Sequence, residues 1–205
     1  AASDVYKRQN LGCKVNAYET EAMQHLLEEA GYEIVPFTQK ADVYVINTCS
    51  VTNMADRKSR QMLHKAKKNN PDSIVVATGC YVQTSEKEVL NDLSVDIVIG
   101  NDRKHDLVRL LEEYSLDSVN DTVDDINDGK HDFEELFIDQ TKEHTRAFIK
   151  VQDGCNQFCS YCIIPYARGR VRSRRFENVI AEVERLAANG LSLIHISEPT
   201  RPRLI

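Results

Sequence analysis

The chain has 205 residues, of which 41% are hydrophobic, and a formal net charge of -6 at pH 7. This length suits one or two domains, and no apolar run approaches the ~20 residues of a membrane-spanning helix, so we expect no membrane partner. The charge is uneven: residues 115–144 hold ten Asp or Glu and two Lys, whereas residues 145–176 hold seven Arg or Lys and one Asp. The acidic total therefore does not exclude a nucleic-acid partner.

Segments of helical and strand character alternate along the first half of the chain. Apolar residues at helical spacing precede Gly31, a common residue at helix ends, and the run DVYVINT is typical of a buried strand. Such alternation predicts a parallel sheet with helices on both faces, so we expect residues 10–114 to form a Rossmann-like α/β domain. The predicted helices span residues 17–30, 54–68, 85–90 and 104–114, and the predicted strands span residues 42–48, 73–78 and 95–99.

A change of composition divides the chain after this domain. Residues 115–144 are strongly acidic and poor in aromatic side chains, which predicts a mobile linker that joins two bodies and belongs to neither core. Residues 145–190 are basic at their start and contain a predicted helix over residues 177–189. We expect them to begin a second domain.

Six cysteines are present, and three of them are far apart in the first half of the chain. The sequence shows no leader for export, and a chain of this length holds a core without disulfides, so we expect a reducing, cytoplasmic setting. Cys49 and Cys80 each follow a predicted strand and Cys13 precedes the first helix, which places this first cysteine set at the sheet edge where ligands bind. The set either converges on a metal or consists of small buried apolar side chains.

The other three cysteines, the second cysteine set, lie within the short segment GCNQFCSYCIIP as Cys155, Cys159 and Cys162. A C-x3-C-x2-C run can supply three thiolates to a cubane iron-sulfur cluster and leave the fourth iron open. An open coordination position on a metal is typical of a catalytic site, whereas a structural site is closed. The alternative is a zinc site, for which His131 and His144 are candidate fourth ligands.

Several motifs resemble one family. The run KVQDGCNQFCSYCIIPYARGRVRSR resembles the cluster motif of radical S-adenosylmethionine methylthiotransferases, and LGCKVNAYETEA, ADVYVINTCSVTNMADRKSRQ and TGCYVQT resemble the N-terminal domain of that family. The resemblance implies an α/β fold in which a methylthiotransferase N-terminal domain precedes the truncated start of a radical SAM partial (β/α) barrel. It also implies two [4Fe-4S] clusters and S-adenosylmethionine as cofactors.

The resemblance further implies a division of roles between the two cysteine sets. The second set would hold the cluster that binds S-adenosylmethionine and releases a 5'-deoxyadenosyl radical, so that the cofactor does the difficult step. The first set would hold a cluster that carries the sulfur to be methylated and transferred. Tyr161 matches the family's aromatic position beside the cofactor adenine, and its alternative is a core tyrosine.

Within the family, the likeness is greatest to the enzymes that act on C2 of N6-threonylcarbamoyladenosine beside the tRNA anticodon. It rests on KVN after Cys13, on YETE, and on YVQT after Cys80. Sibling groups, which act on isopentenyladenosine in tRNA or on an aspartate of a ribosomal protein, remain alternatives. The implied partners are the tRNA anticodon loop and an electron donor, and we expect a monomer.

The segment YARGRVRSRR holds five arginines, a density suited to RNA phosphates or to splayed loop bases. Arg168 and Arg170 are the candidates for substrate contact. They could instead face the cofactor carboxylate, or the segment could be a solvated turn.

Both ends of the chain depart from the family pattern. Residues 1–9 and 191–205 resemble translated sequencing adapters, and we expect them to be non-native. Pro199 and Pro202 lie where the second barrel strand should be, and proline is unsuited to a central strand. A full (β/α) barrel needs ~250 residues, so we expect the parent protein to be the enzyme and this chain alone to be inactive. A hypothesis of another class is a non-catalytic iron-sulfur or zinc binding module.

Overall fold

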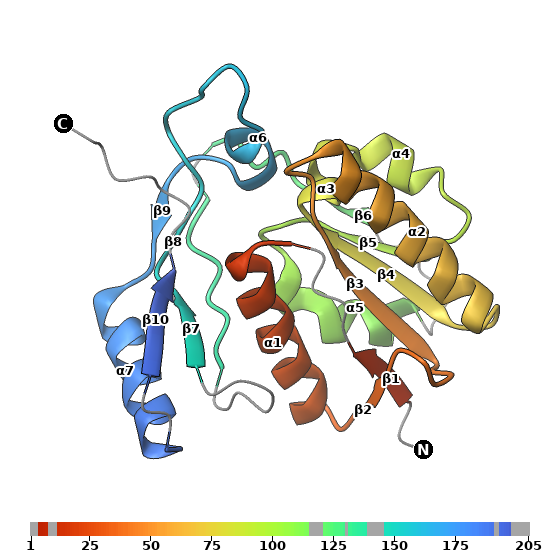
Figure 1. Cartoon of the computed structure of the whole chain (residues 1–205), viewed down its shortest axis with the longest axis horizontal. Coiled ribbons are helices and arrows are strands. Elements are labelled where there is room, and N and C mark those ends of the chain that lie inside the picture. Colours follow the sequence, from red (N-terminus) through yellow and green to blue (C-terminus); the bar gives the residue numbers. More distant parts are fainter. Residues whose placement is uncertain are drawn as a thin grey trace.

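The main body of this computed structural model is a six-stranded parallel sheet in the order β2-β1-β3-β4-β5-β6 (Figure 1). Most residues of β3 and β4 are buried, because both faces of the sheet are covered. The structure describes residues 4–7, 12–114, 121–129, 131–138, 146–190 and 193–197. The strands of the sheet are β1 Asp4–Lys7, β2 Glu33–Pro36, β3 Val43–Thr48, β4 Ile74–Gly79, β5 Ile97–Ile99 and β6 Asp121–Thr122.

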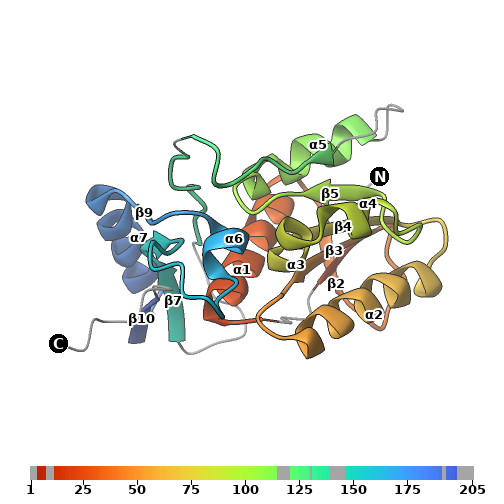
Figure 2. The same ribbon diagram turned by 90° about the horizontal axis from the view of Figure 1, so that it is seen from above.

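Helices cover the two faces of this sheet (Figure 2). On one face, Leu27 and Leu107 pack with Val76 in one apolar core. On the other, Leu63 packs with Val75 in a second core. The first face carries α1 Lys14–Glu29 and α5 Leu107–Tyr114, and the short 3-10 helix η1 Lys104–Asp106 directly precedes α5 in the chain. The second face carries α2 Asn53–Asn69, α3 Cys80–Thr84 and α4 Glu86–Leu90.

The ends of two helices follow from local signals. Thr52 caps α2, since its side-chain oxygen accepts a hydrogen bond from the N–H of Ala55 at 3.1 Å. Lys67 and Lys68 lie in the last turn of α2, where positive charge complements the helix dipole. α1 begins earlier than predicted, directly after Cys13, so that this cysteine occupies the N-cap position.

A β-α-β unit follows the sheet in the chain. β10 pairs in parallel with β7, from Leu193 opposite Arg146 to Ser197 opposite Lys150. β8 and β9 form a separate antiparallel pair. The elements of this part are β7 Arg146–Lys150, β8 Gln152–Asp153, α6 Ile164–Arg168, β9 Arg172–Ser173, α7 Phe176–Ala188 and β10 Leu193–Ser197.

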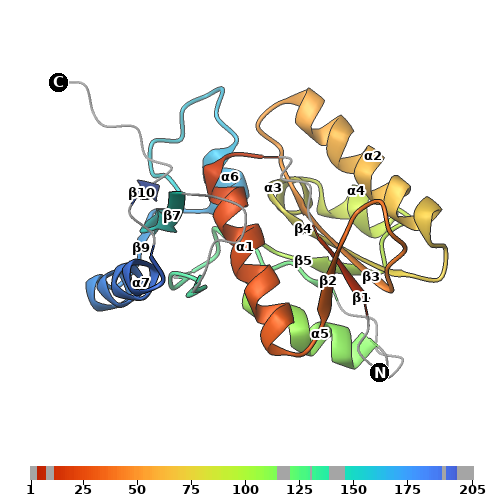
Figure 3. The same ribbon diagram turned by 60° about the horizontal axis from the view of Figure 1, so that its bottom comes forward.

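Helix α1 lies between the sheet and the β-α-β unit (Figure 3). Met23 and Leu27 of α1 pack against the sheet. Tyr18 and Ala22 on its other side join a third apolar core with Ile149 of β7. The two units therefore share one helix and pack as one body.

The acidic segment does not behave as a linker in its described part. Leu136 and Ile138 are 3% and 1% exposed and lie in the core that α1 shares with β7. Ile126 is also buried. The prediction that the segment belongs to neither core is therefore wrong for residues 121–129 and 131–138, because a few apolar side chains among many acidic ones anchor it.

The predicted elements of residues 10–114 are all present, and β2 and α3 were not predicted. The expectation that the second barrel strand is missing is wrong, since β10 occupies Leu193–Ser197 and ends before Pro199. The non-native origin of residues 1–9 and 191–205 stays a prediction. Among the described helices, none combines the length and the apolar character that crossing a membrane requires.

Candidate functional site

The first cysteine set lies at the edge of the sheet formed by the carboxyl ends of its strands. Cys49 directly follows β3, Cys80 directly follows β4, and Cys13 is the N-cap of α1. All three are free thiols, of which Cys13 is exposed and the other two are buried. Burial raises the pKa of the Cys49 and Cys80 thiols. A metal that binds there would have to displace their protons.

The turns that carry these thiols pack closely against one another. Gly79 has a φ of +100°, and a Cβ at this position would overlap the backbone of Thr48. Only glycine therefore lets the end of β4 approach β3 in this way. The side-chain N–H of Asn16 donates to Thr48 O at 2.9 Å, and that of Asn47 donates to Asn16 O at 3.1 Å. These bonds fix the backbone on both sides of the first cysteine set.

The second cysteine set lies on the loop between β8 and α6. Cys159 is exposed, whereas Cys155 and Cys162 are half-buried, and all three are free thiols. The base of the loop is closed by Gly154, whose φ is +76° and where a Cβ would overlap the backbone of Arg170. The N–H of Cys155 donates to Gly169 O at 3.0 Å, which ties the first thiol to the residue after α6.

Aromatic contacts shape the outer part of this loop. Phe158 has a φ of 45°, an uncommon backbone conformation for a residue with a side chain. Its ring meets that of Tyr166 edge to face with centroids 5.9 Å apart, and the Arg170 guanidinium lies 5.3 Å from its centre. Tyr161 is 81% exposed, so it is not a core tyrosine, and its place beside a cofactor adenine stays a prediction.

The thiols of neither described cysteine set surround a common metal position in this structure. Within the described residues, no three His, Cys, Asp or Glu side chains lie close enough to hold one metal ion. One of the two candidate fourth zinc ligands is engaged elsewhere: His131 Nδ1 lies 2.9 Å from Asp102 Oδ2, and its Nε2 lies 2.8 Å from Asp128 O. His144 lies outside the described residues. A cubane cluster is wider than one ion, and three thiolates suit it.

Arg168 is the centre of a buried ion network, and only 1% of its surface is exposed. Its Nη1 donates to Glu19 Oε1 at 2.8 Å and to Asp153 Oδ1 at 3.1 Å, and its Nη2 donates to Asn16 Oδ1 at 2.7 Å. These bonds occupy the guanidinium away from solvent. The predicted substrate contact of Arg168 does not agree with this burial, and Arg170 remains the candidate.

Two buried lysines complete the network. Lys150 Nζ lies 2.8 Å from Glu19 Oε1 and 2.7 Å from Asp153 Oδ2, and Lys104 Nζ lies 3.6 Å from Glu19 Oε2. Burial raises the pKa of Asp153, but Lys150 and Arg168 outweigh it and hold this pKa at about 2. The same balance keeps the pKa of Glu19 well below its usual range. Both carboxylates therefore stay charged.

Sequence reasoning missed this network because its partners are far apart in the chain. Glu19 is separated by 131 residues from Lys150 and by 149 from Arg168. One signal was available: Glu19 precedes Ala22 and Met23 by three and four residues, so it shares their buried helix face. A carboxylate on that face requires a buried cation as a partner.

Comparisons with known proteins agree with this architecture. Residues 6–100 match the uncharacterized protein family UPF0004, and residues 149–202 match the radical SAM superfamily, which implies a [4Fe-4S] cluster and S-adenosylmethionine. The threonylcarbamoyladenosine tRNA methylthiotransferase MtaB of Bacillus subtilis (strain 168) is 47% identical over 88% of this chain and 40% of its own length. The protein of the same name from Aquifex aeolicus (strain VF5) is 44% identical over 89% of this chain and 44% of its own length.

The chain thus spans less than half the length of these relatives. A solved structure, the radical S-adenosylmethionine methyltransferase TsrM from Kitasatospora setae with tryptophan and aza-SAM bound, is 15% identical with a TM-score of 0.61. The match covers 95% of this chain and 47% of that one, and it concerns the fold. Two matched segments in this order, with relatives at 44% and 47% identity, make the chain similar to the radical S-adenosylmethionine methylthiotransferases over the part of their length that it spans.

Proposed function

We propose that the complete protein is a tRNA methylthiotransferase that inserts a methylthio group at C2 of N6-threonylcarbamoyladenosine beside the anticodon. The observation that carries the proposal is that two sets of three free thiols occur on one body, in a chain whose relatives bear that name. The partners are the tRNA anticodon loop and an electron donor. The setting is the cytoplasm, where thiols stay reduced, and the protein is a monomer.

Each cysteine set is proposed to hold one [4Fe-4S] cluster. When bound at the second set together with S-adenosylmethionine, a cluster supplies the one-electron chemistry that the non-acidic C2–H bond requires. When bound at the first set, a second cluster supplies the sulfur. Three thiolates per set leave one iron of each cluster without a protein ligand, so each has a position for a cofactor or for sulfur.

The residues of this chain position these groups. Gly154 and Gly169 close the base of the second loop, and Tyr161 is exposed on it for stacking on an adenine. At the first set, burial raises the pKa of Cys80, whereas the nearby Arg168 guanidinium lowers it. A buried cation beside a set of thiolates favours their charged form.

The test is to express the complete protein in a bacterial strain that lacks tRNA methylthiotransferases and to analyse its tRNA by mass spectrometry. We expect the methylthio derivative of threonylcarbamoyladenosine, and none from a Cys159→Ala variant. A product on isopentenyladenosine only, or on a ribosomal protein only, would show that a sibling function is the correct one.

A non-catalytic iron-sulfur or zinc module is the competing class. It predicts metal binding without cofactor cleavage, so formation of 5'-deoxyadenosine by the reduced complete protein separates the two. We expect Cys159→Ala to abolish this cleavage and Cys49→Ala to retain it while giving no methylthio product. Wild-type levels of cleavage in both variants would refute the division of roles.

A further inference from the structure

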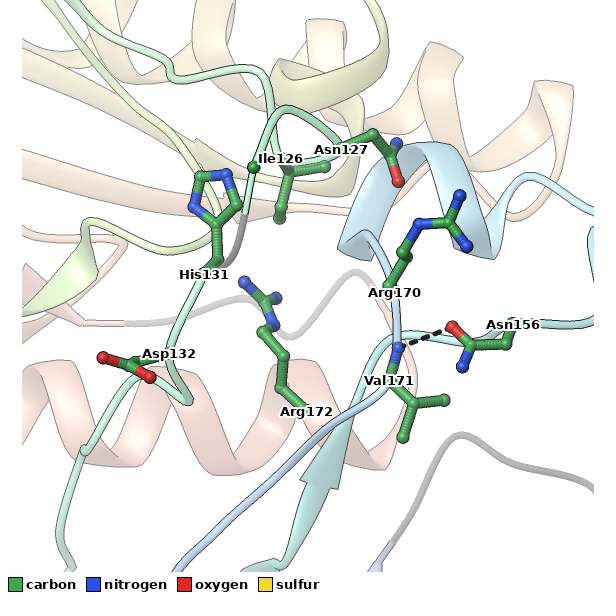
Figure 4. A pocket seen from close by; sticks show the side chains of 9 residues that line it. Ile126, Asn127, His131, Asp132, Asn156, Arg170, Val171 and Arg172 are labelled. Atoms are coloured by element: carbon green, nitrogen blue, oxygen red, sulfur yellow. Dashed lines mark hydrogen bonds between the residues drawn. The ribbon is translucent and has the colours of Figure 1, made fainter.

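A cavity of about 310 Å³ lies between the described part of the acidic segment and the residues that flank the second cysteine set (Figure 4). This volume lies near the lower end of ligand pockets, at roughly 300 Å³, and exceeds what one inorganic anion fills. The cavity adjoins the second cysteine set, since Asn156, the residue after Cys155, lines the cavity. Its polar side chains are Asn127, His131, Asp132, Asn156, Arg170 and Arg172.

Arg172 has unused hydrogen-bond donors at this cavity. Its Nη2 donates to Arg168 O at 2.9 Å. Its Nε and Nη1 are buried and have no hydrogen-bond partner among the residues that the structure describes. Buried donors on a charged group are costly when unpaired and therefore call for an explanation. A ligand with acceptor oxygens supplies one.

The charge of the cavity favours an anion. Arg170 and Arg172 both contribute to its wall, and Asp132 is the one acidic residue among the described residues that line it. Both ring nitrogens of His131 are already engaged, one by Asp102 and the other by a backbone carbonyl, so they are not available to a ligand. Guanidinium groups bind planar oxyanions through paired N–H donors, which makes a carboxylate a suitable ligand.

The size and the remaining polar groups specify the ligand further. A carboxylate on a small organic group fills the cavity, and Asp132 and Asn127 offer oxygen acceptors to an N–H or a hydroxyl of that group. The threonylcarbamoyl group has a carboxylate, a hydroxyl and N–H groups, whereas an isopentenyl group has none of these. An apolar group would leave the Arg172 donors unpaired.

We infer that this cavity binds the threonylcarbamoyl group of the substrate nucleoside and that Arg172 bonds its carboxylate. The inference rests on the proposed function. It adds a substrate-binding residue, and it supplies partners for the two Arg172 donors that have none among the described residues. Arg170, whose guanidinium lies 5.3 Å from the centre of the Phe158 ring, adds positive charge to the lining of the same cavity.

The experiment titrates the 15N-labelled chain with the nucleoside N6-threonylcarbamoyladenosine and follows the Nε–H resonance of Arg172 by NMR. We expect a saturable shift of this resonance, and no shift with adenosine or N6-isopentenyladenosine. Arg172→Gln should weaken binding at least about tenfold, and Arg172→Lys should weaken it less because the charge remains. Arg175→Gln is the matched control: Arg175 is exposed, and its variant should bind like the wild type.

The titration of the wild-type chain tests the inference by itself, even if an arginine variant misfolds. No shift at Arg172, or equal binding of adenosine, would overturn the inference. Equal occupancy by inorganic phosphate would make the cavity a general anion site, and Arg172-dependent binding of S-adenosylhomocysteine would make it a cofactor site; either result overturns the inference. The proposed function is tested separately on tRNA. If the tRNA assay gives the methylthio product on threonylcarbamoyladenosine but the Arg172 resonance does not shift in the titration, only the inference is refuted. If the Arg172 resonance shifts but the tRNA assay gives no such product, the proposed function is refuted.

Discussion

The arginines of the basic segment differ in their surroundings. Arg168 is buried among Glu19, Asp153 and Asn16, whereas Arg172 lines a cavity and has two donors there without a partner among the described residues. Arg174 is buried and pairs with Glu182 and Glu135. The spacing of these arginines in the sequence does not tell which of them is buried, because the carboxylates that pair with Arg168 and Arg174 come from other elements.

Removing the charge of Arg168 should destabilise the chain strongly. Arg168→Met removes one of the two cations that Glu19 and Asp153 share, the other being Lys150, and breaking a buried ion pair on one side costs about 3–5 kcal/mol. The free energy of unfolding, measured with urea by circular dichroism, should fall by this order. Arg175→Met removes an exposed arginine and should change it little. Equal small effects in both variants would show that the network does not hold the fold.

The network should also make stability depend on pH in the acid range. Cationic partners overcome the effect of burial and lower the pKa of Asp153 from 3.8 to about 2. Its contribution is therefore complete above pH ~4 and is lost as pH falls toward 2, and it is on the order of 2 kcal/mol. The stability difference between wild type and Asp153→Asn should shrink over this window. Asp72→Asn, at an exposed position, should show no such trend.

At the scale of elements, the acidic segment contributes to the core through a few side chains. Leu136 and Ile138 pack with Tyr18 of α1 and Ile149 of β7. The Tyr18 hydroxyl also donates to Leu136 O at 2.6 Å. Segment 131–138 therefore holds α1 against the β-α-β unit.

A matched pair of leucines tests this packing. Leu136 is 3% exposed and Leu93 is 97% exposed, so Leu→Ala removes the same atoms in two environments. Leu136→Ala should lower the free energy of unfolding by about 2–5 kcal/mol, because it leaves a cavity in a core. Leu93→Ala should have almost no effect. If limited proteolysis of the wild type cuts first within residues 131–138, the segment is not anchored as described.

The elements that the sequence predicts correctly are those whose signals are local. The alternation of apolar runs predicted β3, β4 and β5, and with them the positions of Cys49 and Cys80, because those signals lie within single elements. The anchoring of Leu136 was not predictable in this way. It depends on α1 and β7, which no local pattern in an acidic segment indicates.

At the scale of the whole molecule, a short path connects the two cysteine sets. The N–H of Cys155 bonds Gly169 O, and the neighbouring Arg168 bonds Asn16, three residues after Cys13. Asn101 contributes a second link, since its side-chain N–H donates to Ala167 O at 2.5 Å and lies 3.9 Å from Cys80 Sγ. The β-α-β unit is thus docked directly onto the edge of the sheet that carries the first set.

Because the two sets lie on different units of one body, each should hold its cluster without the other. Anaerobic reconstitution of the chain with iron and sulfide should give about eight irons, since each cubane contains four. Replacing the first set (Cys13, Cys49, Cys80) by alanine should leave about four irons, and replacing the second set (Cys155, Cys159, Cys162) should leave about four as well. Iron and acid-labile sulfide analysis measures these numbers, and circular dichroism verifies that each variant is folded. Loss of all iron from either variant would show that the sets depend on each other, and one or two tightly bound zinc ions in place of iron would favour the structural metal module.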